Sequence, residues 1–118
     1  MPGKILLADD DKNLLELYTW ICRDTDYSFT TASSFAEASG LIEAGHYDLL
    51  ITDLFFPDGL GTELIRSFGE KYAGSKSLLI TGEPGATEVT RLPAGTEYLP
   101  KPFTPRLFRA ALTKALGG

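Results

Sequence analysis

Short apolar runs recur along this chain, separated by segments with the residue pattern of helices. Most of the runs are apolar throughout, which is typical of strands buried on both faces of a parallel sheet. Together with one alternating run rich in aromatic and β-branched residues, they predict strands at residues 5–8, 27–31, 48–53, 77–81 and 97–99. This alternation of strands and helices predicts an α/β fold with right-handed crossovers, doubly wound around one sheet.

Capping signals mark the starts of three helices. Each is preceded by a residue whose side-chain oxygen can accept from the free amides of the first turn. These N-cap residues are Asp11, Ser34 (with Glu37 completing a capping box) and Thr104 (followed by Pro105). The three helices are predicted to end near residues 23, 45 and 116, and a further helix spans about residues 61–72. Phe103 and Phe108 occupy the positions of a hydrophobic staple at the last helix start.

The first helix and the stretch before the last strand show opposite patterns. On the first helix, one face carries Leu14, Leu17, Tyr18 and Ile21 and is expected to pack on the sheet. Between residues 82 and 96, prolines and glycines interrupt the helical pattern, so that only a short helix is expected around residues 86–92. Counting this short helix with the four described above, we predict a single domain, residues 1–118, with about five helices.

Charge and composition exclude several classes of protein. The net charge of −5 argues against direct binding to nucleic acid, which requires clustered lysines and arginines. No apolar run approaches the roughly 20 residues of a membrane-spanning helix. No signal peptide precedes the first strand, and the single cysteine, Cys22, cannot form an internal disulfide. A cytoplasmic protein is expected.

Polar residues lie at the ends of four of the predicted strands, at the sheet edge where doubly wound folds bind ligands. Asp9 and Asp10 come at the end of the first strand, Asp53 ends the third, Thr81 ends the fourth, and Lys101 follows the fifth. Three carboxylates in one cleft repel one another, so a cation is needed to offset them. Lys101 supplies one positive charge, and Mg²⁺, which prefers oxygen ligands and phosphate, would supply two. The pattern predicts a Mg²⁺ site where a carboxylate can accept a phosphoryl group.

These residues carry a family resemblance. The chain resembles the receiver domains of bacterial response regulators over essentially its whole length. The matching stretches are residues 4–11, residues 48–57, the Thr81-Gly82 step and residues 98–103. The resemblance implies a flavodoxin-like sheet with strand order 2-1-3-4-5. It also implies a role in two-component phosphorelay signal transduction, with a histidine kinase or phosphotransfer protein as the phosphoryl donor.

The resemblance assigns the acceptor and the metal ligands. Asp53 would be the phosphoacceptor. Asp10 and Asp53 would ligate Mg²⁺ directly, together with the backbone carbonyl of Phe55, and Asp9 would reach the ion largely through water. The bulky Phe55 side chain departs from the family pattern at a position that often modulates access of water.

The resemblance also assigns contacts to the phosphoryl group and a switch. Lys101 and Thr81 would contact the phosphoryl oxygens, and Pro102 would follow a cis peptide bond that aims Lys101 inward. Tyr98, together with Thr81, would form the aromatic switch that reports phosphorylation to an output partner, which the sequence does not identify. The stretch 82–96 is about two residues shorter than usual, so a monomer or a weak dimer is expected.

Two other functions stay open at this point. The chain could be an interaction module that keeps the fold but signals without phosphorylation, although such modules usually lack one of the acids, the threonine or the lysine. It could also be a small Mg²⁺-dependent phosphohydrolase or a flavin binder. A flavin phosphate would be repelled by Asp9, Asp10 and Asp11, and 118 residues leave little room for a specificity segment. We expect a signalling domain rather than an enzyme, with only self-phosphorylation and autodephosphorylation as its chemistry.

Overall fold

Five strands form one parallel sheet in the computed structural model, which describes residues 3–82, 92–93 and 95–116. They are β1 (Lys4–Ala8), β2 (Ser28–Ala32), β3 (Leu49–Asp53), β6 (Lys76–Thr81) and β7 (Thr96–Pro100). Their spatial order is β2-β1-β3-β6-β7, and every neighbouring pair runs parallel. This is the predicted order 2-1-3-4-5 when the strands of this sheet are numbered along the chain. The predicted α/β doubly wound fold is confirmed.

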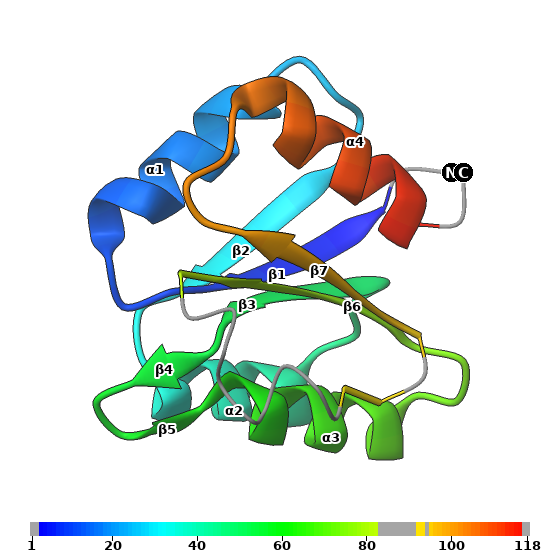
Figure 1. Ribbon diagram of the computed structural model, residues 1–118. Helices are drawn as coiled ribbons and strands as arrows, with labels where there is room; N and C mark the ends of the chain where they lie inside the picture. The colour runs from blue at the N-terminus through cyan, green and yellow to red at the C-terminus, as the bar shows by residue number, and fades with distance from the viewer. Residues whose placement is uncertain (1–2, 83–91, 94, 117–118) are drawn as a thin grey trace.

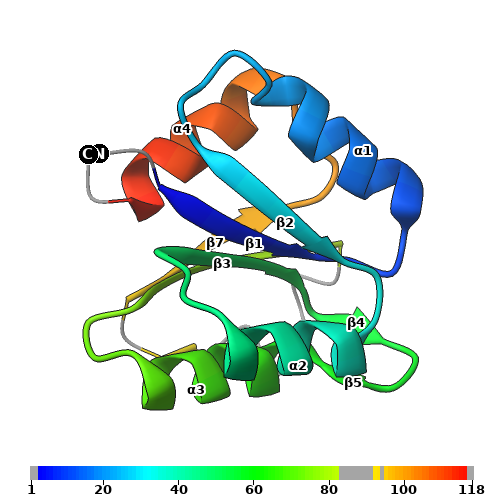
Figure 2. The same ribbon diagram turned by 180° about the vertical axis from the view of Figure 1, so that it is seen from behind.

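Among the described residues, four helices cover the sheet, two on each face (Figures 1 and 2). α1 (Lys12–Ile21) and α4 (Pro105–Ala115) cover one face, and α2 (Phe35–Ala44) and α3 (Gly61–Lys71) cover the other. The short helix expected around residues 86–92 lies outside the described residues, apart from Leu92.

Each apolar strand contributes to two cores, because successive side chains of a strand point to opposite faces of the sheet. Ile5 and Leu7 join the core under α1 and α4, whereas Leu6 joins the core under α2 and α3. Phe108 fills the first core and Phe68 the second, and both rings are fully buried. This burial on both faces is what the continuously apolar strand sequences predicted.

Helix α1 buries a slightly different face from the predicted one. Tyr18 and Ile21 are buried and Leu14 is partly buried, as expected, but Leu17 is 40% exposed and Leu15 is buried instead. Tyr18 lies near the centre of the buried face. Its chain neighbour Leu17 is turned away from Tyr18 by about 100°, the rotation per residue of an α-helix, and so points towards solvent.

The predicted N-caps form. The side chains of Asp11, Ser34 and Thr104 accept hydrogen bonds from amides in the first turns of α1, α2 and α4. The capping box differs in one bond: the Glu37 carboxylate accepts from the amide of Ser33, one residue earlier than the motif predicts. The helix starts are therefore fixed by local hydrogen bonds that the sequence specifies.

A short hairpin that the sequence pattern did not predict follows β3. β4 (Phe55–Phe56) pairs antiparallel with β5 (Gly59–Leu60), between Asp53 and the start of α3. The hairpin is held on α2, because the Asp58 carboxylate accepts hydrogen bonds from the amides of Phe35 and Ala36, both at 3.0 Å. The backbone that follows Asp53 is thereby linked to the first turn of α2.

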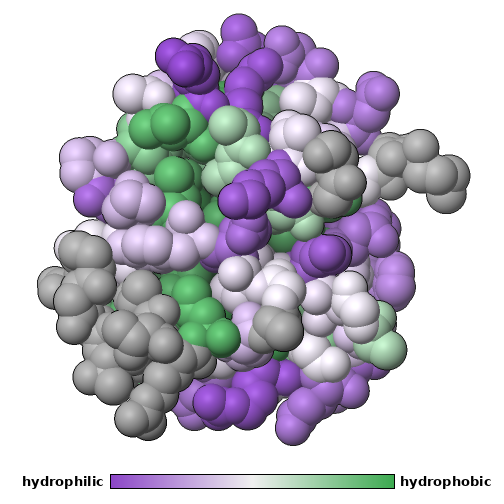
Figure 3. All heavy atoms as spheres, turned by 45° about the vertical axis from the view of Figure 1, so that its right-hand side comes forward, coloured by the Kyte–Doolittle hydropathy of each residue, from purple (hydrophilic) through white to green (hydrophobic). Residues whose placement is uncertain are grey.

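The surface of the molecule carries both polar and apolar side chains. On the face drawn in Figure 3, apolar residues show as separate patches among polar ones. Among the described residues, the large apolar side chains that are most exposed are Leu17, Trp20, Phe55 and Leu107. None of the helices that the structure describes has the length and apolar character required to cross a bilayer.

Candidate functional site

Three carboxylates converge at the carboxyl ends of β1 and β3. One carboxylate oxygen from each of Asp9, Asp10 and Asp53 lies within 4.8 Å of the other two. The convergence follows from the sheet: β1 and β3 are neighbours with Ala8 opposite Thr52, so the residues after them emerge side by side. The structure thus brings together the three acids that the sequence analysis assigned to one site.

The three acids differ in exposure. Asp9 is 1% exposed, Asp53 is half-buried and Asp10 is exposed. Backbone amides hold the two less exposed carboxylates: Asp11 donates to Asp9 Oδ1 at 2.9 Å, and Leu54 donates to Asp53 Oδ1 at 2.8 Å. The orientations of both carboxylates are therefore set by the chain that immediately follows them.

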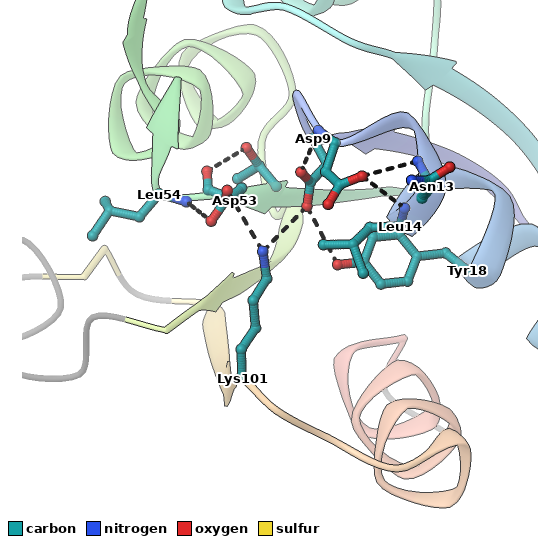
Figure 4. A network of polar contacts seen from close by, with 9 residues as sticks. Asp9, Asn13, Leu14, Tyr18, Asp53, Leu54 and Lys101 are labelled. Atoms are coloured by element: carbon teal, nitrogen blue, oxygen red, sulfur yellow. Dashed lines mark hydrogen bonds and ion pairs between the residues drawn. The ribbon is translucent and has the colours of Figure 1, made fainter. Parts of the chain in front are cut away.

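Lys101 lies between Asp9 and Asp53. Its Nζ atom is 3.5 Å from Asp9 Oδ2 and 3.6 Å from Asp53 Oδ2, so one ammonium group contacts both carboxylates (Figure 4). The backbone amide of Lys101 donates to the carbonyl of Thr81 at 2.9 Å, which ties the segment after β7 to the end of β6. The Lys101–Pro102 peptide bond is cis.

Burial dominates the electrostatics of the site. It raises the pKa of Asp9 above its ordinary value, although the amide of Asp11 and the charge of Lys101 act in the opposite direction. Burial likewise raises the pKa of Asp53, with Lys101 lowering it and the charge of Asp9 raising it further. Both charged carboxylates are therefore less favourable here than in water, even with Lys101 in place. A cation bound beside these carboxylates would favour their charged forms.

The remaining assigned residues surround the acids at different depths. Thr81 ends β6 and is buried, one residue beyond Ile80, which lies opposite Asp53 in the sheet. Tyr98 lies in β7, and its ring packs against the core under α2 and α3. Its hydroxyl is buried and, among the described residues, has no hydrogen-bond partner. The Phe55 side chain is 43% exposed in β4.

One residue at the site was not anticipated in that role. The sequence placed Tyr18 on the buried face of the first helix, but not beside the acids. In the structure its hydroxyl donates to Asp9 Oδ2 at 3.3 Å. A buried tyrosine hydroxyl usually requires a polar partner, which was the available signal.

Comparison with known proteins agrees with this geometry. Residues 5–113 match the response regulator receiver domain family. The chain belongs to this family. As a receiver domain it functions in two-component phosphorelay signal transduction, and it is a signalling domain rather than a conventional enzyme.

Relatives of this receiver domain include regulators of transcription. It is 30% identical over 116 residues to the alginate biosynthesis transcriptional regulatory protein AlgB of Pseudomonas aeruginosa, covering 97% of this chain and 26% of AlgB. It is 33% identical over 104 residues to the transcriptional regulatory protein ResD of Bacillus subtilis, covering 87% of this chain and 43% of ResD. The chain thus spans less than half the length of either relative.

Solved receiver structures share the fold throughout. A response regulator receiver protein from Sinorhizobium medicae superimposes with a TM-score of 0.90 at 26% identity, covering 99% of this chain and 96% of that one. A CheY-like receiver domain from Methanospirillum hungatei gives a TM-score of 0.85 at 27% identity, covering 99% and 95%.

Proposed function

We propose that Asp53 is the phosphoacceptor of this receiver domain and that Asp9, Asp10 and Asp53 hold Mg²⁺ during the transfer. The observation that carries the proposal is the convergence of the three carboxylates to within 4.8 Å. Lys101 supplies one positive charge in contact with Asp9 and Asp53, so the three carboxylates keep a net negative charge. Carboxylate oxygens of this kind suit Mg²⁺, which also keeps positions for water and phosphate oxygens.

Exposure separates the roles of the three acids. Asp9 is too deeply buried to meet a phosphoryl donor, whereas Asp10 is exposed and lies outside the ion pairs with Lys101. Asp53 is accessible and yet fixed, because its Oδ1 accepts from Leu54 and its Oδ2 lies beside Lys101. Asp53 Oδ2 is therefore the oxygen best placed to attack. On the family resemblance, the backbone carbonyl of Phe55 would complete the protein ligands to the metal.

The proposed transfer exchanges one bond to phosphorus for another. A carboxylate oxygen of Asp53 forms a bond to phosphorus while the phosphorus–nitrogen bond of a phosphohistidine breaks, and the leaving imidazole nitrogen keeps the electron pair and takes up a proton. Mg²⁺, when bound, would neutralise negative charge on the phosphoryl oxygens and bring them to the acids. The Lys101 ammonium and the Thr81 hydroxyl would take the other phosphoryl oxygens, as charge-assisted and neutral hydrogen-bond donors.

Partners follow from this chemistry and from the family. Receiver domains of response regulators interact with histidine kinases, and we propose a phosphohistidine on a kinase or phosphotransfer protein as the donor for this chain. The relatives named above are transcriptional regulators. We propose that the phosphorylated receiver acts on an output partner through a surface that includes β7, with Tyr98 reporting the state of the site.

Chemical phosphorylation tests the acceptor directly. Incubation with Mg²⁺ and acetyl phosphate is expected to add one phosphoryl group to the wild type, measured by mass spectrometry, and none to Asp53→Asn. Asp26→Asn is the matched control, because Asp26 is exposed and lies outside the carboxylate cluster. Phosphoryl transfer that survives in Asp53→Asn would disprove the assignment, and so would a requirement for Asp26.

A further inference from the structure

Tyr18 connects the acidic site to the aromatic core of α4. Its hydroxyl donates to Asp9 Oδ2, which also lies near the Lys101 ammonium, whereas Asp9 Oδ1 is held by the backbone amide of Asp11 (Figure 4). The buried Asp9 carboxylate thus has one oxygen fixed by the backbone and the other fixed by two side chains. One of these two, Lys101, is shared with Asp53.

Packing fixes the position of the Tyr18 ring. It stacks on Phe108 with centroids 5.1 Å apart and planes within 6°, and on Phe103 with centroids 5.8 Å apart. Phe103 and Phe108 stack on each other as well, at 5.6 Å, as the predicted staple requires. Tyr18 is 2% exposed and Phe108 is completely buried. The Tyr18 ring, and with it the hydroxyl, is therefore held in place by two other rings, and one of these, Phe103, lies two residues after Lys101.

We propose that Tyr18 is a positioning residue that holds Asp9 in the orientation needed for metal binding when Lys101 turns to the phosphoryl group. This inference rests on the proposed function. The contact of Lys101 Nζ with Asp9 Oδ2 is 3.5 Å, the outer limit of a hydrogen bond, so movement of the ammonium towards the phosphoryl oxygens would weaken it. Without Tyr18, a buried carboxylate oxygen would then lose its side-chain donors, which is costly for a charged group. The Tyr18 hydroxyl is neutral and stays with Asp9.

Two features suit Tyr18 to this role. A tyrosine hydroxyl keeps its proton at physiological pH, since its ordinary pKa is about 10, so Tyr18 can donate to Asp9. The hydrogen bond of 3.3 Å is also longer than the roughly 2.7 Å typical of O–H···O bonds, so a small movement of the Asp9 carboxylate towards the fixed hydroxyl would shorten it when Lys101 moves. Residues in the second layer of a metal site act in this way, and their loss usually lowers metal affinity by about 10- to 100-fold.

Tyr18→Phe tests the role of the hydroxyl, because it keeps the stacked ring and removes only the oxygen. The measurement is the Mg²⁺ affinity of the folded, chelator-treated protein by isothermal titration, with folding checked by circular dichroism. We expect at least about a tenfold loss of affinity. Tyr47→Phe is the control, since Tyr47 is also a buried tyrosine but packs in the core on the other face of the sheet. Its affinity should equal that of the wild type.

Phe108→Leu tests the role of the ring independently. It keeps the Tyr18 hydroxyl but removes the ring that lies most nearly parallel to the Tyr18 ring. The expected loss of Mg²⁺ affinity is therefore smaller than in Tyr18→Phe. Equal affinities of wild type and Tyr18→Phe would overturn the inference while leaving the proposed function intact. Unchanged affinity in Phe108→Leu would overturn the part that concerns the ring. A wild-type protein that does not bind Mg²⁺ would overturn the proposed function, and this inference with it.

Discussion

Gly61, the first residue of α3, lies so close to the backbone carbonyl of Asp53 that a Cβ atom on Gly61 would overlap the carbonyl oxygen. The Gly61 amide also donates to the carbonyl of Leu54 at 2.7 Å, so the chain folds back tightly against Asp53. Any side chain at this position must move either the start of α3 or the backbone of Asp53. Glycine is therefore required here for close approach, and its φ angle is not positive.

Gly61→Ala should lower both stability and metal affinity. Overpacking of this kind typically costs about 1–3 kcal/mol in the free energy of unfolding, measured by urea denaturation. The displaced Asp53 should also weaken Mg²⁺ binding. Gly40→Ala is the matched control, because Gly40 lies within α2 and a Cβ there would meet no heavy atom within 4 Å. That change should stabilise the protein by about 0.5–1 kcal/mol and leave Mg²⁺ affinity unchanged. Equal stability changes in the two variants would contradict this account.

Much of the fold was predictable because local signals agree with one another. Continuously apolar strands, side-chain caps at Asp11, Ser34 and Thr104, and the alternation of strands and helices predicted the doubly wound layout, and the family resemblance supplied the strand order. The converging acids were predictable for the same reason, since parallel strands bring their carboxyl ends to one edge of the sheet. Once β1 and β3 are neighbours, as that strand order requires, the positions of the strand ends place Asp9 beside Asp53.

Other features depend on contacts between segments that are distant in the sequence. The two-residue strands of the hairpin are too short to show periodicity, and Asp58 reaches the start of α2 across 22 and 23 residues. The contact of Tyr18 with Asp9 depends on how α1 is seated on the sheet, which the helical pattern gave only approximately, as the exposed Leu17 shows. Helical spacing identifies a buried face but does not identify what each side chain meets there.

Asp58 should make stability depend on acid pH. Its hydrogen bonds from the amides of Ala36 and Phe35 lower its pKa below the ordinary value of 3.8. A carboxylate with a lowered folded-state pKa stabilises the protein above the unfolded-state pKa, and this contribution is lost as pH falls through the folded-state pKa. Asp58→Asn should therefore be less stable than wild type at neutral pH, with the difference shrinking below about pH 4.

Ser34→Ala is the control for the Asp58 prediction. Ser34 caps the same helix by accepting from the amide of Glu37, but it carries no titratable group. Its loss should lower the free energy of unfolding by about 0.5–2 kcal/mol, and this decrease should not change with pH. Urea denaturation from pH 3 to pH 7 measures both variants. A difference between wild type and Asp58→Asn that stays constant across this range would refute the pH effect.

Lys101→Ala should separate metal binding from phosphoryl transfer. The ammonium competes with any cation for Asp9 and Asp53, so its removal should leave Mg²⁺ affinity equal to or higher than that of the wild type. Phosphorylation by acetyl phosphate should slow by about 100-fold or more, since a donor to the transferring group is lost. Lys114→Ala is the control, because Lys114 pairs with Glu97 near the start of β7, at the opposite end of that strand from Lys101. Loss of Mg²⁺ binding in Lys101→Ala would contradict the division of roles.

Tyr98→Phe should stabilise the unphosphorylated protein and weaken its response. Among the described residues the buried Tyr98 hydroxyl has no hydrogen-bond partner, and an unsatisfied buried hydroxyl typically costs about 1–3 kcal/mol. Removing it should raise the free energy of unfolding accordingly.

The same hydroxyl should also matter for the switch. A second position of the Tyr98 ring that brings the hydroxyl to water would remove the cost of burying it. The hydroxyl therefore reduces the free-energy difference between the two ring positions, and phosphorylation can shift their populations. Without it, the β7 resonances in NMR spectra should change less on addition of Mg²⁺ and beryllofluoride. Tyr27→Phe, a partly buried tyrosine on the opposite face, should respond as the wild type does. A full β7 response in Tyr98→Phe would show that the hydroxyl has no part in the switch.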